Sequence, residues 1–73
     1  MTIGERIAKL REMRGWNTYE LAQRAEVPYP VLQRIEHGKR KGEQMRLDTA
    51  MRLARGLGVS LDLLTGMDDR EAL

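Results

Sequence analysis

Apolar residues recur along the chain at the three- and four-residue spacing of amphipathic helices. In the first segment the repeat is Ile3, Ile7 and Leu10, which would align on one side of a helix. The chain has no phenylalanine, and helical spacing recurs along it far more than the apolar-polar alternation of a half-buried strand. The pattern therefore predicts an all-α fold, a compact bundle of about five short helices.

Capping residues and glycines mark where these helices begin and end. Thr2 with Glu5, and Asn17 with Glu20, place a capping oxygen three residues ahead of a carboxylate that reaches back. Helix ends are marked by glycines that follow apolar runs, where a left-handed residue is favoured: Gly15, Gly38, Gly58 and Gly66. We predict helices at residues 3–14, 18–25, 30–37, 47–56 and 61–65.

Helices this short are not stable alone, so their apolar stripes must share one core. The predicted core residues are Ile3, Ile7, Leu10, Leu21, Ala22, Ala25, Leu32, Ile35, Leu47, Ala50, Met51, Leu53, Ala54, Leu61 and Leu64. A single core implies a single domain, at residues 1–66, followed by an acidic tail at residues 67–73.

Size and composition exclude several classes of protein. A chain of 73 residues forms one small domain, with little room for a large catalytic cleft. Cysteine is absent, which rules out disulfides and thiolate metal ligands. No stretch approaches the roughly 18 to 20 apolar residues that span a membrane. We expect a cytoplasmic protein without a metal or cofactor.

Positive charge is concentrated in the first 61 residues. The net charge is +2, and residues 62–73 carry −3, so residues 1–61 carry +5. The densest run holds Lys39, Arg40, Lys41 and Arg46 against Glu43. Such a run is either a solvated loop or a surface that contacts phosphates, and charge alone is compatible with both.

The two helices predicted at 18–25 and 30–37 are joined by a short turn, with Ala22 where two steeply crossing helices must approach closely. This arrangement is typical of a helix-turn-helix. The order NTYELAQRAEVPYPVLQRIEHGK and then RLDTAMRLARGLGVSLDLLTG resembles the DNA-binding domain of lambda-repressor-like and Cro-like regulators, the XRE family. The resemblance covers residues 3–66. Its most specific pieces are ELA at 20–22, RIEHGK at 34–39 and LARGLGVSLDLL at 53–64.

In this family the second helix of the motif enters the major groove of DNA with its N-terminal part. The positions that match the family's base contacts are Tyr29, Pro30, Gln33 and Arg34. Helical spacing independently places these four on one face, with Leu32 and Ile35 on the other. Arginine suits guanine O6 and N7, and glutamine suits adenine. On an arbitrary helix, Gln33 and Arg34 would be ordinary exposed residues.

The resemblance also implies contacts to phosphate, which position the protein without reading sequence. The matching residues are Thr18, His37, Lys39, Arg40 and Lys41. Free N–H groups at the start of the helix at 18–25 would add partial positive charge there, so Asn17 and Thr18 form a candidate phosphate seat. His37 is equally suited to stabilising the dipole at its helix end when protonated.

Two further roles are structural. Arg11 and Glu36 occupy positions where the family commonly has an ion pair that ties the first helix to the end of the third. Trp16 has no aromatic neighbour in sequence that suggests a base-stacking platform, and we interpret it as a packing residue.

The sequence departs from the family pattern at the turn and in the loop that follows. Glu26 stands where glycine is usual, although that position often needs a positive φ. Pro30 disfavours helical geometry in Tyr29, so we expect the helix to begin at residue 30. The loop GKRKGEQMR is longer than usual, and Arg46 replaces the customary capping residue. An extended basic loop could follow the DNA backbone or enter a narrow minor groove.

These observations predict a sequence-specific regulator that binds double-stranded DNA, most simply a repressor that occupies a palindromic operator as a homodimer. An alternative is an antitoxin or other interaction module that also binds a protein partner, for which the tail DDRE would suit a basic surface. We expect no catalytic activity, because Ser60 and His37 are the only serine and histidine and no phosphate-binding loop or metal-ligand cluster is present.

Overall fold

The computed structural model describes residues 2–37 and 45–65 of the chain. These residues form five helices and no strand, which confirms the all-α prediction. The helices are α1 (Ile3–Met13), α2 (Thr18–Ala25), α3 (Tyr29–His37), α4 (Leu47–Leu57) and α5 (Leu61–Thr65). Within these two ranges, no helix has the length and apolar character needed to cross a membrane.

Both predicted capping boxes are present. The Thr2 hydroxyl accepts from the backbone N–H of Glu5 at 3.1 Å, and the Glu5 carboxylate accepts from the backbone N–H of Thr2 at 3.1 Å. Asn17 and Glu20 make the same exchange at 2.8 and 3.0 Å. These bonds satisfy helix N–H groups that have no partner within the helix, so the starts of α1 and α2 are set locally.

Two of the four predicted glycine stops lie among the described residues and are confirmed. Gly15 has φ 72°, and Gly58, which caps α4, has φ 73°. Residues with a side chain rarely adopt this left-handed backbone. Gly38 and Gly66 lie outside the described residues.

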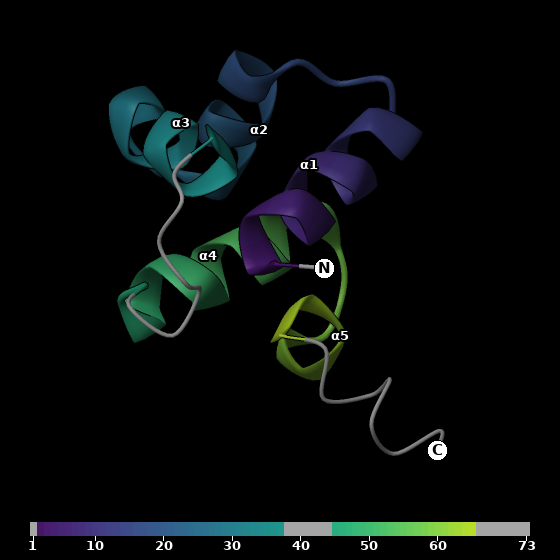
Figure 1. Ribbon diagram of the computed structural model, residues 1–73, viewed down its shortest axis with the longest axis vertical. Coiled ribbons are helices and arrows are strands. Elements are labelled where there is room, and N and C mark those ends of the chain that lie inside the picture. The colour runs from purple at the N-terminus through teal and green to yellow at the C-terminus, as the bar shows by residue number, and fades with distance from the viewer. Residues whose placement is uncertain (1, 38–44, 66–73) are drawn as a thin grey trace.

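In Figure 1, α2 and α3 lie together at the top, with α1 beside them and α4 and α5 below. The main packing pairs are α2 with α4 and α1 with α3. Each helix contributes one fully buried aliphatic side chain to the shared core: Ile7, Leu21, Leu32, Leu53 and Leu64. The buried side chains of the five helices form one cluster, and Leu32 holds α3 against it.

The predicted core is wrong at two positions of α4. Leu47 is 66% exposed and Met51 is 53% exposed, whereas Leu57 is buried and was missed. At 3.6 residues per turn, Met51 lies about 200° around the helix from Leu53, and Leu53 is the residue that faces the core. The prediction also missed Val27, in the turn after α2, which is buried. Helix ends differ by one residue, since α1 ends at Met13 and α4 at Leu57.

Two glycines allow helices to approach closely. A Cβ atom at Gly4 of α1 would collide with the backbone of Ile35 in α3. At Gly56 of α4, a Cβ atom would lie 2.9 Å from the Cα atom of Ala25 in α2. The absence of side chains at these points therefore sets how closely α1 and α4 pack against the helix pair α2 and α3.

Candidate nucleic-acid interface

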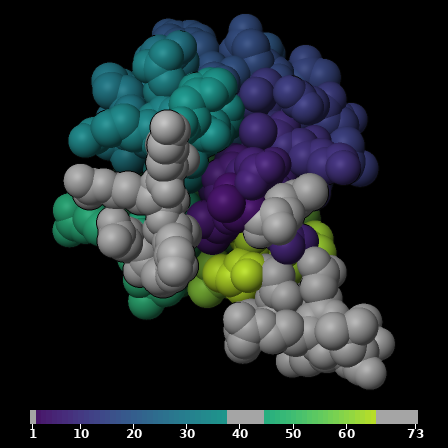
Figure 2. All heavy atoms as spheres, in the orientation of Figure 1, coloured from purple at the N-terminus to yellow at the C-terminus, as the bar shows by residue number. Residues whose placement is uncertain are grey.

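The outer face of α3 carries the four side chains predicted to contact bases. Tyr29, Pro30, Gln33 and Arg34 are all exposed, while Leu32 is fully buried and Ile35 packs against the core. In Figure 2 the teal atoms of α3 form part of the molecular surface. Among the described residues, the side chains of Gln33 and Arg34 have no hydrogen-bond or ion-pair partner, so their side-chain donors are available to a ligand.

The predicted start of α3 at residue 30 is wrong, because the helix begins at Tyr29. The backbone N–H groups of Val31 and Leu32 donate to the carbonyl oxygen of Pro28 at 3.0 and 3.1 Å. Pro30 is therefore in the first turn, where a missing N–H costs no helical hydrogen bond. Tyr29 is thus one helical turn before Gln33 and on the same face.

The turn between α2 and α3 contains the left-handed residue that the sequence suggested. Glu26 has φ 57° and ψ 44°, a conformation that costs a side-chain-bearing residue roughly 1–2 kcal/mol. Local contacts hold it in place: the N–H of Val27 donates to the carbonyl of Ala22 at 2.9 Å, and Arg52 Nη1 donates to the carbonyl of Glu26 at 3.0 Å. Val27 is buried beneath the turn. The turn therefore fixes the direction in which α3 leaves α2.

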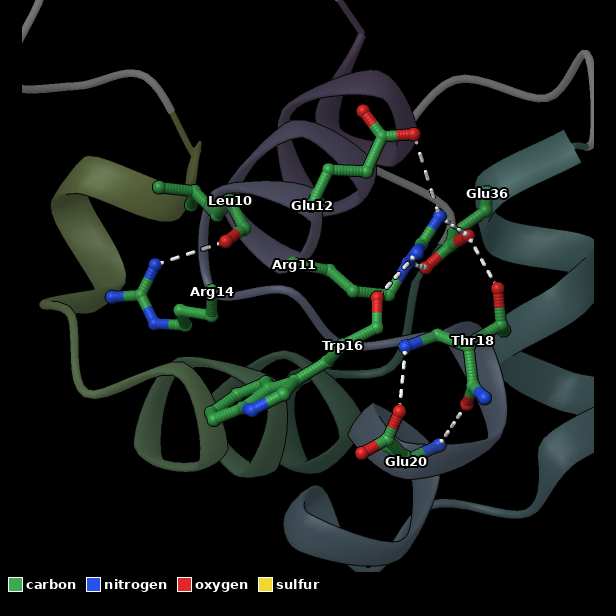
Figure 3. Close-up of polar contacts among 9 residues, drawn as sticks. Leu10, Arg11, Glu12, Arg14, Trp16, Thr18, Glu20 and Glu36 are labelled. Atoms are coloured by element: carbon green, nitrogen blue, oxygen red, sulfur yellow. Dashed lines mark hydrogen bonds and ion pairs between the residues drawn. The ribbon is translucent and has the colours of Figure 1, made fainter.

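A buried ionic network joins α1, α2 and α3 (Figure 3). Arg11 Nε donates to Glu36 Oε2 at 3.0 Å and Nη2 to Oε1 at 3.2 Å, a two-point pair between α1 and α3. The side chain of Glu36 is 0% exposed and that of Arg11 12%. Arg11 Nη1 also donates to the Trp16 carbonyl at 2.7 Å, and the Thr18 hydroxyl donates to Glu36 Oε1 at 3.1 Å.

The network holds the C-terminal end of α3 and the first residue of α2 in a fixed relation. Within residues 2–37 and 45–65, no buried side-chain nitrogen or oxygen lacks a hydrogen-bond partner. A fully satisfied buried network rigidifies the elements that it joins. The two helices that would meet a duplex are therefore oriented by the fold before any ligand binds.

A family model described as helix-turn-helix matches residues 7–64. The chain belongs to this helix-turn-helix family. A crystal structure of SinR, described as the master regulator for biofilm formation, in complex with DNA matches with a TM-score of 0.77 and 28% identity. The match covers 86% of this chain and 97% of the SinR chain. No curated protein matches the sequence. The resemblance to lambda-repressor-like regulators and the predicted fold class are confirmed.

In this helix-turn-helix domain the side chains of Asn17 and Thr18, at the start of α2, make contacts within the protein. The Asn17 side chain accepts from the N–H of Glu20, and the Thr18 hydroxyl donates inward to Glu36. The backbone N–H groups of Thr18 and Tyr19, the first two of the helix, have no acceptor within it. If this helix end meets a phosphate, backbone donors face it, and the Glu20 carboxylate beside them partly offsets their charge.

The other predicted phosphate contacts lie at and beyond the end of α3. His37 is the last residue of α3 and is exposed, which suits both a phosphate contact and stabilisation of the helix dipole. Lys39, Arg40 and Lys41 lie outside the described residues, as does the tail at 67–73. Arg46, the N-cap residue just before α4, makes no side-chain capping bond.

The structure adds contacts that sequence reasoning did not identify. Tyr19 of α2 packs against Tyr29, with ring centroids 6.2 Å apart. The Arg24 guanidinium lies 4.3 Å from the centre of the Trp16 ring, which is partly buried against the core. The interpretation of Trp16 as a packing residue agrees with this position. Neither contact has a sequence signal, because each depends on how the chain turns between elements.

Proposed function

We propose that this chain is a transcriptional regulator that binds double-stranded DNA in a sequence-specific way, acting as a repressor through occupancy of its operator. The observation that carries the proposal is the outer face of α3, where polar side chains are exposed and without partners among the described residues while the helix itself is anchored from behind. The family and the similarity to SinR, solved in complex with DNA, support the same conclusion.

Two kinds of contact have different roles in recognition: contacts to base edges select the sequence, and contacts to phosphates position the domain. Arg34 reads guanine through two hydrogen bonds to O6 and N7, and Gln33 reads adenine, each contact worth about 1–3 kcal/mol of discrimination. Phosphates are held by the free backbone N–H groups of Thr18 and Tyr19 at the start of α2, and by side chains at and beyond the end of α3: His37, Lys39, Arg40 and Lys41. These contacts position the domain and carry no sequence information. Regulation then needs no chemistry, because a bound domain excludes other proteins from the site.

One domain of this size offers a small surface to DNA, so we propose that the protein binds as a homodimer in the cytoplasm. Two copies related by a twofold axis place their α3 helices in successive major grooves, and the operator is then palindromic with half-sites about one helical turn apart. Sedimentation on operator DNA tests this part, with two chains per duplex expected and one chain per duplex contradicting it.

Selection from random duplex DNA, followed by a salt titration of the selected site, tests the function. A palindromic consensus is expected, with an affinity whose logarithm falls linearly with the logarithm of salt concentration, at a slope of about −0.9 per phosphate contact. A scrambled duplex of equal length and composition is the control and should bind weakly with a similar slope. No enrichment over the scrambled duplex would contradict the proposal.

A further inference from the structure

Two exposed tyrosines meet where α2 faces the start of α3. Tyr19 is 54% exposed and Tyr29 is 39% exposed, and their rings are 6.2 Å apart between centroids and tilted by 56°. The tilted arrangement at this distance is a favourable geometry for aromatic pairs. Gln23, one turn further along α2, donates from Nε2 to the Tyr19 hydroxyl at 3.1 Å. The Tyr19 side chain therefore contacts Tyr29 through its ring and Gln23 through its hydroxyl.

This pair lies outside the core, so stability alone does not account for it. Both residues remain exposed, so each buries a smaller share of its surface than the core side chains do. What the pair does is restrict Tyr29. A side chain at the first turn of a helix, facing solvent, samples several rotamers, and a neighbouring ring removes some of that freedom before a ligand arrives.

Tyr29 lies one helical turn before Gln33 on the exposed face of α3. Its ring therefore extends the proposed reading surface toward the helix N-terminus, the end that enters the major groove in this motif. The ring offers mainly apolar contact. Among the base edges of the major groove, the C5-methyl group of thymine is the apolar feature, so thymine is the base to which such a ring is matched.

We propose that Tyr19 is a positioning residue, which holds the Tyr29 ring against the methyl group of a thymine in each half-site. The inference rests on the proposed function, since it assigns a base preference to that interface. Tyr19 itself acts through Tyr29 and makes no base contact in this scheme. Specificity at one base pair then depends on a residue in α2, outside the recognition helix.

A methyl scan of the selected duplex tests the proposal. Each thymine is replaced in turn by uracil, as deoxyuridine, which removes the C5-methyl group and leaves every hydrogen-bonding group of the base unchanged. When the thymine that contacts Tyr29 in a half-site is replaced, the affinity of the wild-type protein should fall about fourfold. This is the fold-change expected when one buried methyl-sized group is removed. The Tyr29→Ala variant should bind the two forms of that site equally.

The decisive variant is Tyr19→Ala, which leaves Tyr29 in place. We expect its ratio of thymine to uracil affinity at that position to fall below about twofold. Tyr19→Phe keeps the ring and should retain most of the preference. Met13→Ala removes another exposed apolar side chain, 74% exposed on α1, and should leave the ratio unchanged. Thermal unfolding of each variant separates loss of fold from loss of specificity.

The outcomes are distinguishable. A selected consensus whose affinity is insensitive to every methyl deletion overturns this inference and leaves the proposed function standing. A Tyr19→Ala variant with the full wild-type ratio also overturns it, because Tyr29 would then need no support. Failure to select any consensus overturns the proposed function and this inference together.

Discussion

Removal of Arg11 is expected to destabilise the domain far more than loss of a surface ion pair. In Arg11→Met the aliphatic part of the side chain is kept and the guanidinium is lost. Glu36, whose side chain is 0% exposed, then keeps the Thr18 hydroxyl as its remaining partner among the contacts described above. A buried carboxylate without its cation is costly because water cannot replace the missing charge.

The magnitude follows from burial. Breaking a buried ion pair by removing one partner costs about 3–5 kcal/mol, against 0–1 kcal/mol for an exposed pair. At roughly 0.05–0.15 kcal/mol per residue, a domain of 73 residues has about 4–11 kcal/mol in total. Arg11→Met should therefore remove a large share of the stability, and a loss of 3 kcal/mol should lower the Tm by at least about 12 °C.

Urea unfolding of a double-mutant cycle measures the effect. Glu36→Gln removes the charge and keeps the shape, so the double variant Arg11→Met with Glu36→Gln should be more stable than Arg11→Met alone, with a coupling of about 1.5 kcal/mol or more. Glu12→Gln alters a carboxylate that is 69% exposed and 3.8 Å from Arg11, and it serves as the control. Losses that simply add, or an Arg11→Met cost below about 1 kcal/mol, would refute the reasoning.

Three further predictions concern local geometry. Gly4→Ala should cost about 1–3 kcal/mol, because the added Cβ meets the backbone of Ile35; an unchanged urea midpoint would show that the contact between α1 and α3 gives way freely. Glu26→Gly should raise the Tm by a few degrees, since it removes the strain of a left-handed non-glycine residue and the gain exceeds the added flexibility of the unfolded chain; a lower Tm would contradict this. The hydrogen bond from the Thr2 backbone N–H, and next the one with the Thr2 side chain, lower the pKa of Glu5 below its ordinary value of 4.5. The stabilisation of the folded state by ionised Glu5 is present above pH 4.5 and is lost as pH falls through the folded-state pKa. An NMR titration of the Glu5 carboxyl with a midpoint at or above 4.5 would contradict this prediction.

Features that depend on neighbours in sequence were predictable. The capping boxes at Thr2 and Asn17 and the stop at Gly58 involve residues a few positions apart, so the same groups meet in any fold that contains those helices. The start of α3 was mispredicted although the signal was local. The rule against a helical residue before Pro30 is a preference, and in the first turn the missing N–H has no cost.

Features that depend on packing were not predictable in the same way. Along α4, Leu47 with Met51 and Leu53 with Leu57 both satisfy helical spacing, and contact with α2 decides which pair is buried. The pair of Arg11 and Glu36 was reached through the family resemblance, because 25 positions separate the two residues. Tyr19 and Tyr29 are brought together by the turn at Glu26, whose direction no local pattern specifies.

The central claim is that the exposed face of α3 reads DNA sequence. The most direct test is the affinity of Arg34→Ala for every single-base-pair variant of the selected operator, with Lys39→Ala, altered at a proposed phosphate contact, as the matched control. Arg34→Ala should lose its preference at one G·C pair per half-site, a change of about 1–3 kcal/mol, while Lys39→Ala should weaken binding to all variants alike. If Arg34→Ala also weakens every variant equally, α3 does not read the sequence through this residue and the account fails.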